Sequence, residues 1–76
     1  MGKPTRITNS IRALRFAHGE MTQAQLAERI GVTRQTVIAI EQGRYSPSLE
    51  MAFRIAHVFG VRLDDVFQYP DPEGDP

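Results

Sequence analysis

The chain has 76 residues, with nine basic and nine acidic side chains and no cysteine. A chain of this length builds one small core and buries only about 60% of the surface that its unfolded form exposes. The lack of cysteine excludes disulfides and thiolate metal sites. No apolar run approaches the roughly 20 residues that span a bilayer, and the polar start MGKPTRITNS is no signal peptide. We therefore expect a soluble cytoplasmic protein with no membrane partner.

The net charge of zero conceals two halves of opposite sign. Residues 1–44 carry seven basic and three acidic side chains, a net charge of +4. Residues 45–76 carry two basic and six acidic side chains, a net charge of −4. The basic half can face the phosphates of a nucleic acid while the acidic half faces away.

Five helices are predicted, and the first lies in the basic half. Thr8 or Asn9 can cap it, it ends near His18, and Gly19 follows. The segment 1–7 before it is expected to form an N-terminal arm.

The segment 23–42, QAQLAERIGVTRQTVIAIEQ, has the pattern of a DNA-binding helix-turn-helix. Ala27 is small enough for the point where two steeply crossing helices approach each other, and Gly31 suits the left-handed backbone of a tight turn. Five apolar positions form the underside that packs on a core: Leu26, Ile30, Val32, Val37 and Ile40. An ordinary helical hairpin is the alternative, but it needs neither Ala27 nor so short a turn.

Capping residues punctuate these two helices independently of the apolar pattern. Thr22 and Gln25 have the spacing of a capping box at the start of the second helix. Thr33 can cap the third helix. Both features place the break at Gly31-Val32.

The acidic half is predicted to hold two more helices. Ser48 can cap a helix over about 49–59, closed by Gly60, and a short fifth helix lies near 63–67. The fourth helix has a broad apolar face, made of Leu49, Ala52, Phe53, Ile55, Ala56 and Phe59. The tail 70–76 is acidic and rich in proline and glycine, so we expect it to be disordered.

The last structured stretch, 61–69, is unusually apolar for a chain end. Four of its side chains are predicted to form a self-association surface: Leu63, Val66, Phe67 and Tyr69. The alternative is that all of them belong to the core. A dimer would hold two recognition helices about 34 Å apart, on successive major-groove faces of one duplex.

From Met21 to Phe67 the sequence resembles the Cro/C1-type (Xre) repressors, most of all their short stand-alone members. The resemblance covers about 11–69. It implies an all-α, five-helix, lambda-repressor-like DNA-binding domain over 8–69, and a homodimer formed through the C-terminal region. Some relatives also pair a strand before the first helix with one after the fifth, here 6–8 with 67–69.

Two positions depart from the family pattern. Gly19-Glu20 makes the first loop about one residue longer than usual. Arg62 stands where a serine, threonine or proline is usual, so the fifth helix is expected to lack its side-chain cap.

The third helix is predicted to enter the major groove of DNA. Because Val37 and Ile40 are buried, its opposite face presents Arg34, Gln35, Ile38, Ala39 and Gln42. Arginine and glutamine form paired hydrogen bonds with guanine and adenine respectively, so we expect Arg34 and Gln35 to contact bases. Ile38 and Ala39 are predicted to pack on a thymine methyl group. The alternative for Arg34 is an ordinary solvated surface arginine.

The resemblance and the helix geometry also predict phosphate contacts. Gln23 lies at a helix start, where free N–H groups and the helix dipole favour an anion. Arg44 and Tyr45 lie just past the third helix, where related proteins contact the phosphate backbone. The predicted set is Gln23, Thr33, Thr36, Gln42, Arg44 and Tyr45.

No catalytic or metal site is expected. In relatives, the glutamate at the place of Glu41 pairs with an arginine of the first helix, and Arg15 is the candidate here. His18 and His57 have no partners at ligand spacing, so we predict no metal, no cofactor and no enzyme activity.

Two functions remain open. The first is a nucleoid-associated transcription regulator, acting as a repressor that occupies an operator in double-stranded DNA, with no room for a small-molecule sensor domain. The second is an antitoxin-like protein-interaction module of a toxin–antitoxin pair, for which the apolar chain end and acidic tail would supply the binding surface.

Overall fold

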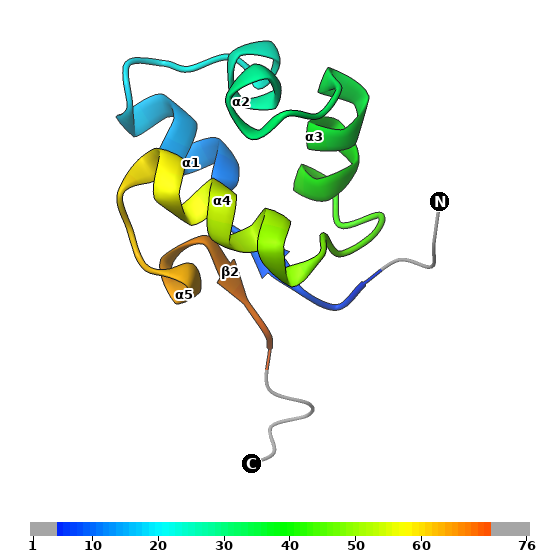
Figure 1. The fold of residues 1–76 in the computed structure, drawn as a ribbon. Coiled ribbons are helices and arrows are strands. Elements are labelled where there is room, and N and C mark those ends of the chain that lie inside the picture. Colours follow the sequence, from blue (N-terminus) through cyan, green and yellow to red (C-terminus); the bar gives the residue numbers. More distant parts are fainter. Residues whose placement is uncertain (1–4, 71–76) are drawn as a thin grey trace.

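The computed structural model describes residues 5–70, which form five helices and one two-stranded antiparallel sheet (Figure 1). In chain order the elements are β1 (Thr8–Asn9), α1 (Ile11–Ala17), α2 (Gln23–Ile30), α3 (Arg34–Glu41), α4 (Leu49–Phe59), α5 (Leu63–Val66) and β2 (Phe67–Gln68). The predicted five-helix domain with a small terminal sheet is therefore confirmed. The expectations for residues 1–4 of the arm and for 71–76 of the tail lie outside the described residues.

The sheet joins the two ends of the described chain. Thr8 pairs with Gln68 and Asn9 with Phe67, so β1 begins at the last residue of the expected segment 6–8 and extends one residue beyond it. Beyond the sheet, the Ser10 N–H donates to the Val66 carbonyl at 2.8 Å. Because of this pairing, α1 begins later than expected, at Ile11.

Local capping sets the starts of three helices as predicted. Thr22 and Gln25 form both halves of the capping box, with bonds of 3.0 and 2.8 Å. The Thr33 hydroxyl accepts from the Thr36 N–H at 3.2 Å, and the Ser48 hydroxyl accepts from the Met51 N–H at 3.1 Å. Each bond satisfies a backbone donor that the first helical turn leaves without a partner.

The two departures from the family pattern have clear structural consequences. The longer loop after α1 contains two successive left-handed residues, Gly19 at φ 75° and Glu20 at φ 56°. At α5 the Arg62 side chain supplies no cap. Instead the Asp65 carboxylate accepts from the Arg62 N–H at 3.0 Å, which is the reverse half of a capping box.

Every helix contributes to one core. Its largest fully buried side chains are Ile11, Leu26, Ile30, Val37, Ile55 and Val66. The apolar face of α4 is divided, because Ile55 and Phe59 enter the core whereas Leu49 and Phe53 remain 68% and 51% exposed. Within the described residues, no helix has the length and apolarity that crossing a membrane requires.

One predicted surface residue belongs to this core. Val66 was expected at the self-association surface, but its exposure is 0%, so that assignment is wrong. The physical reason is the β1–β2 pairing, which holds the end of α5 against the start of α1 through the Ser10–Val66 bond.

Candidate nucleic-acid interface

The α2–α3 unit holds one helix face open to solvent. Ala27 is buried with 3% exposure, and Gly31 adopts the left-handed φ of 77° that the turn requires. Val37 and Ile40 anchor the inner face of α3 in the core. Among the described residues, α2 packs mainly against α3 and α4. The side of α3 that faces away from the core remains exposed to solvent.

The outer side of α3 forms a polar ridge, which we define as Thr33, Arg34, Gln35, Ile38 and Gln42. All of these are exposed except Ile38, which is half-buried, as is the neighbouring Thr36. Arg34 and Gln35 therefore lead the ridge at the start of the helix, as the sequence predicted. The ridge presents a guanidinium and a carboxamide, which are groups that recognise base edges in a groove.

Ala39 is not part of this ridge. Its exposure is 1%, so the prediction that it contacts a thymine methyl group is wrong. The chain that leaves α3 folds back at this point, and the Arg44 N–H donates to the Ala39 carbonyl at 3.0 Å. The covered side of α3 is therefore broader than the spacing of Val37 and Ile40 indicated, and it includes Ala39.

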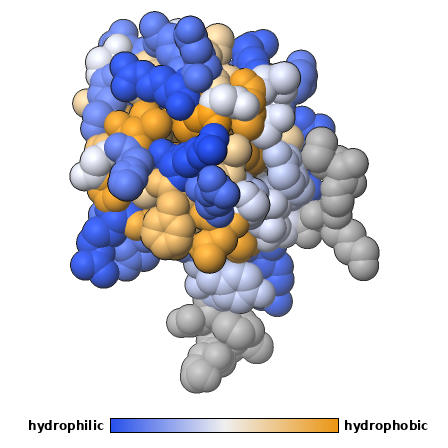
Figure 2. Space-filling view, in the orientation of Figure 1, coloured by the Kyte–Doolittle hydropathy of each residue, from blue (hydrophilic) through white to orange (hydrophobic). Residues whose placement is uncertain are grey.

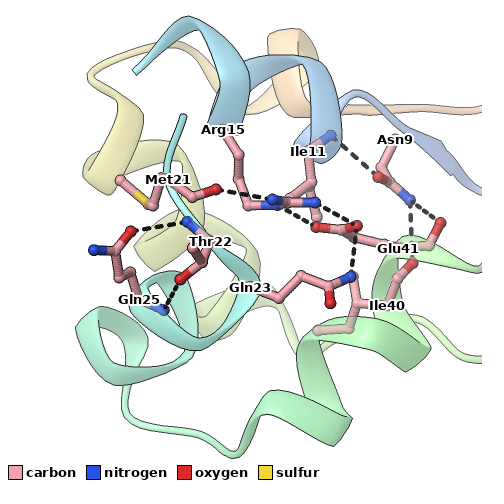
Figure 3. Close-up of polar contacts among 9 residues, drawn as sticks. All are labelled: Asn9, Ile11, Arg15, Met21, Thr22, Gln23, Gln25, Ile40 and Glu41. Carbon is pink, nitrogen blue, oxygen red and sulfur yellow. Dashed lines mark hydrogen bonds and ion pairs between the residues drawn. The ribbon is translucent and has the colours of Figure 1, made fainter. Parts of the chain in front are cut away.

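A buried ion pair joins α1 to α3 (Figure 3). Arg15 Nε donates to Glu41 Oε2 at 2.7 Å and Arg15 Nη2 donates to Glu41 Oε1 at 3.1 Å, forming the pair that the resemblance implies. Arg15 is only 7% exposed, and its Nη1 donates to the Met21 carbonyl at 2.8 Å. The geometry is paired and charge-assisted, so it fixes α1 relative to α3 in angle as well as distance.

Gln23 extends this ion pair to α2. Its Nε2 donates to Glu41 Oε1 at 3.2 Å, so the side chain expected to bind phosphate is tied to the end of α3 (Figure 3). The start of α2 and the end of α3 are thereby held together at the edge of the ridge. The sequence did not indicate this link, because 18 positions separate the two residues and no local periodicity relates them.

Asn9 is a second positioning residue that the sequence analysis only partly identified. Its Oδ1 accepts from the Ile11 N–H at 3.1 Å, which starts α1. Its Nδ2 donates to the carbonyls of Ile40 and Glu41 at 3.1 and 3.4 Å, which satisfies the end of α3. A single side chain therefore bonds to the start of α1 and to the last carbonyls of α3, and Figure 3 shows both sets of bonds.

Of the other predicted phosphate-contact residues, Thr33 and Gln42 belong to the ridge, whereas Thr36, Arg44 and Tyr45 are its neighbours in the sequence. The Thr33 and Thr36 hydroxyls are 3.1 Å apart and are partly engaged in capping α3. Arg44 is exposed and Tyr45 is half-buried in the loop that follows. All of them remain candidates for phosphate contacts.

An apolar face lies away from the ridge, on α4, α5 and β2. We define the apolar face as Leu49, Phe53, Leu63 and Phe67, of which the first two are exposed and the last two half-buried. Leu63 and Phe67 line two adjoining surface hollows, one shared with Leu49 and the other with Phe53. Figure 2 shows apolar side chains gathered on the α4–α5 side of the molecule. Tyr69, after β2, is 62% exposed.

Comparison with known proteins identifies the family. A family model described as helix-turn-helix matches residues 11–66. The match includes the ridge and all five helices, and the two strands lie just outside it. The chain belongs to the Cro/C1-type helix-turn-helix family.

Relatives of the family are similar over most of this chain. An HTH-type transcriptional regulator of Methanocaldococcus jannaschii is 51% identical over 65 residues, covering 86% of this chain and 97% of its own. The cryptic phage CTXphi transcriptional repressor RstR of Vibrio cholerae is 34% identical over 78% of this chain and 52% of its own. The restriction-modification controller protein C.AhdI of Aeromonas hydrophila is similar in structure, with a TM-score of 0.65 and 29% identity over 72% of this chain and 78% of that one.

The family is one of DNA-binding transcription regulators, and this chain is a member by sequence and by fold. In this helix-turn-helix protein, the ridge of α3 stands where the family's DNA-binding motif requires an unobstructed helix face.

Proposed function

We propose that this helix-turn-helix protein is a sequence-specific transcription repressor that binds a palindromic operator as a homodimer. The helix α3 would lie in the major groove of double-stranded DNA. The observation that carries the proposal is the exposed pair Arg34 and Gln35 at the free start of α3, on a helix whose opposite face is anchored in the core.

The chemistry of the ridge supports base contacts. An arginine can donate two bonds to guanine O6 and N7, and a glutamine can bond to adenine N6 and N7. Ile38, half-buried beside them, offers an apolar surface to a thymine methyl group. Phosphate contacts from Gln23, Thr33, Thr36, Gln42, Arg44 and Tyr45 would set the position of the protein on the duplex.

The ion pairs leave positive charge available at the ridge. Arg15 is neutralised by Glu41, and Arg54 and Arg62 lie 3.4 and 3.3 Å from carboxylates on their own segments. Within residues 5–70, neither Arg34 nor Arg44 has a carboxylate at ion-pair distance. These two guanidiniums can therefore meet phosphate or base without first breaking an internal pair.

The apolar face supports the homodimer. Leu49 and Phe53 expose large apolar side chains on α4, next to Leu63 and Phe67, and a small monomer seldom leaves such a continuous patch in water. We assign it to a second copy of the chain, related by a two-fold axis. A two-fold dimer presents two copies of α3 to one duplex, which matches a palindromic operator.

The action as a repressor follows from occupancy of the operator. A bound dimer covers the duplex and excludes polymerase from the same site. The similarity to RstR, whose name is that of a transcriptional repressor, supports this direction of control.

Selection of bound duplexes from a random DNA pool tests the proposal. We expect a palindromic consensus whose half-sites are about one helical turn apart. Arg34→Ala should then lose about 1–3 kcal/mol of binding free energy on the selected operator and relax the preference at one base pair. Arg29→Ala, an exposed arginine of α2 outside the ridge, is the matched control.

Two outcomes would contradict the proposal. One is an Arg34→Ala variant that binds operator and scrambled duplex with wild-type affinities. The other is a co-purifying protein that occupies the apolar face in place of a second copy, which would favour the antitoxin-like alternative.

A further inference from the structure

We propose that α1 supplies a further DNA contact, in which Arg12 binds a backbone phosphate and the ring of Phe16 orients its guanidinium. The inference rests on the proposed function and extends the DNA-binding surface beyond the α2–α3 unit. Neither residue belongs to the base-contact or phosphate-contact sets given above.

The first support is position. Arg12 and Phe16 of α1 line a surface groove together with Gln23 of α2 and with Arg34 and Gln42 of α3. The two α1 side chains therefore open onto the same hollow as the two ends of the ridge. A duplex seated on α3 would pass the mouth of this groove.

The second support is charge. The groove contains Arg15 and Glu41, which neutralise each other in the buried pair. The charged side chains that remain in its lining are Arg12 and Arg34, opposed by Glu20 alone. Among residues 5–70, Arg12 forms no ion pair, and it is exposed. A polyanion is the partner that such a groove favours.

The third support is the arrangement of Phe16. Its ring is 53% exposed, although it is a large apolar side chain. The Cζ atom of Arg12 lies over this ring at 5.5 Å from its centroid, and that of Arg15 lies over it at 5.7 Å. The Phe16 ring thus contacts both the exposed guanidinium of Arg12 and the guanidinium of Arg15, which the ion pair with Glu41 holds in place.

This arrangement has a functional consequence. A guanidinium held against an aromatic face keeps its N–H edge free, and that edge matches the oxygens of a phosphate. Restricting the side chain before binding also lowers the ordering cost at the interface. We assign Arg12 to a phosphate and not to a base edge, because α3 is the helix proposed to lie in the major groove of DNA. A phosphate contact carries no sequence preference.

The test measures binding to the selected operator and to a scrambled duplex at several salt concentrations. Arg12→Ala should weaken binding to both duplexes by the same factor. The plot of log K against log salt, which has a negative slope, should become less steep by about one unit. Phe16→Leu should weaken binding with the slope unchanged, because the charge remains, and Phe16→Tyr should restore the affinity. Thermal unfolding of each variant checks that the fold is retained.

Two controls and a mapping experiment make the result specific. Arg29→Ala should leave the slope at the wild-type value, whereas Arg44→Ala should make it less steep. Phosphate ethylation interference should show one interfering phosphate in the wild type that no longer interferes in Arg12→Ala. That phosphate should lie at the edge of a half-site.

The inference is overturned if Arg12→Ala keeps both the wild-type slope and the wild-type interference pattern while Arg34→Ala still relaxes base preference. In that case the proposed function stands and the α1 contact does not. If the wild-type protein binds no duplex at all, both fail. A change in base preference on Arg12→Ala would also overturn it, since a phosphate contact is independent of sequence.

Discussion

The Arg15–Glu41 pair shows how one residue contact can organise the whole DNA-binding unit. Arg15 lies in α1 and Glu41 ends α3, while Gln23 adds the start of α2 to the same carboxylate. Removing two charges from water is costly, and good geometry with additional hydrogen bonds is needed to offset it. The contribution of the pair is therefore best sought in the unique arrangement of the three helices.

A double-mutant comparison tests this interpretation at the residue scale. Arg15→Met should lower the free energy of unfolding by about 3–5 kcal/mol, because it leaves a buried carboxylate without its partner. Arg15→Met combined with Glu41→Leu should lose less than the single variant, since no buried charge remains. Urea denaturation followed by circular dichroism measures both.

The comparison also distinguishes the buried pair from a surface one. Glu50→Ala, which breaks the exposed pair of Glu50 and Arg54, should change stability by less than about 1 kcal/mol. The interpretation is wrong if Arg15→Met is as mild as Glu50→Ala, or if the double variant is less stable than the single one.

At the element scale, the turn between α2 and α3 fixes the direction of the ridge. The backbone N–H of Gly31 donates to the carbonyls of Ala27 and Glu28, which ends α2, and Thr33 caps α3 two residues later. Arg54 of α4 adds a bond of 3.3 Å from its Nη1 to the Ile30 carbonyl. The turn is thus held from within and from the neighbouring helix.

Substitution of Gly31 isolates the cost of its backbone conformation. A methyl group at Gly31 would meet only Arg54 Nη1 at 3.7 Å, an ordinary contact, so the strain arises from the left-handed φ of 77°. We expect Gly31→Ala to destabilise the fold by about 1–2 kcal/mol. Gly31→Asn should lose less, because asparagine tolerates this conformation better. Thermal unfolding of the two variants decides, and an equal loss for both would contradict this explanation.

At the scale of the whole molecule, DNA binding and self-association are proposed to use two separate surfaces. The ridge and the α1–α3 groove carry the positive charge proposed to face DNA, and the apolar face on α4, α5 and β2 is assigned to the second copy. This division matches the charge of the sequence, in which seven of the nine basic residues precede position 45.

Breaking the dimer should separate these two functions. Phe53→Glu places a charge on an exposed residue of the apolar face, so we expect a folded monomer by sedimentation velocity. Each monomer would then bind one half-site independently of the other. The affinity for the full operator should therefore fall by at least tenfold, while binding to a single half-site is retained. Ala17→Glu, which adds the same charge to an exposed position of α1, should leave the dimer intact. A Phe53→Glu protein that remains dimeric would place the interface elsewhere.

Much of the fold was predictable because its signals act over a few residues. Thr22, Thr33 and Ser48 each cap a helix through a bond to a donor three residues ahead. The left-handed glycines at 31 and 60 end helices that periodicity had already outlined. The exposure of Arg34 and Gln35 follows from the same periodicity, since the burial of Val37 fixes the opposite face of α3.

The tertiary structure decided what depends on segments that meet only after folding. Ala39 lies on the buried side of α3, and the pairing of β1 with β2 holds Val66 against the start of α1, although helical spacing left both free to face outward. The bonds of Asn9 and Gln23 to α3 span 31 and 18 positions, so no local pattern encodes them. The sequence by itself determined the helices and the residues that lead the ridge, because those depend on one turn of backbone at a time. Which side chains share a groove or a core was left to the way the helices cross.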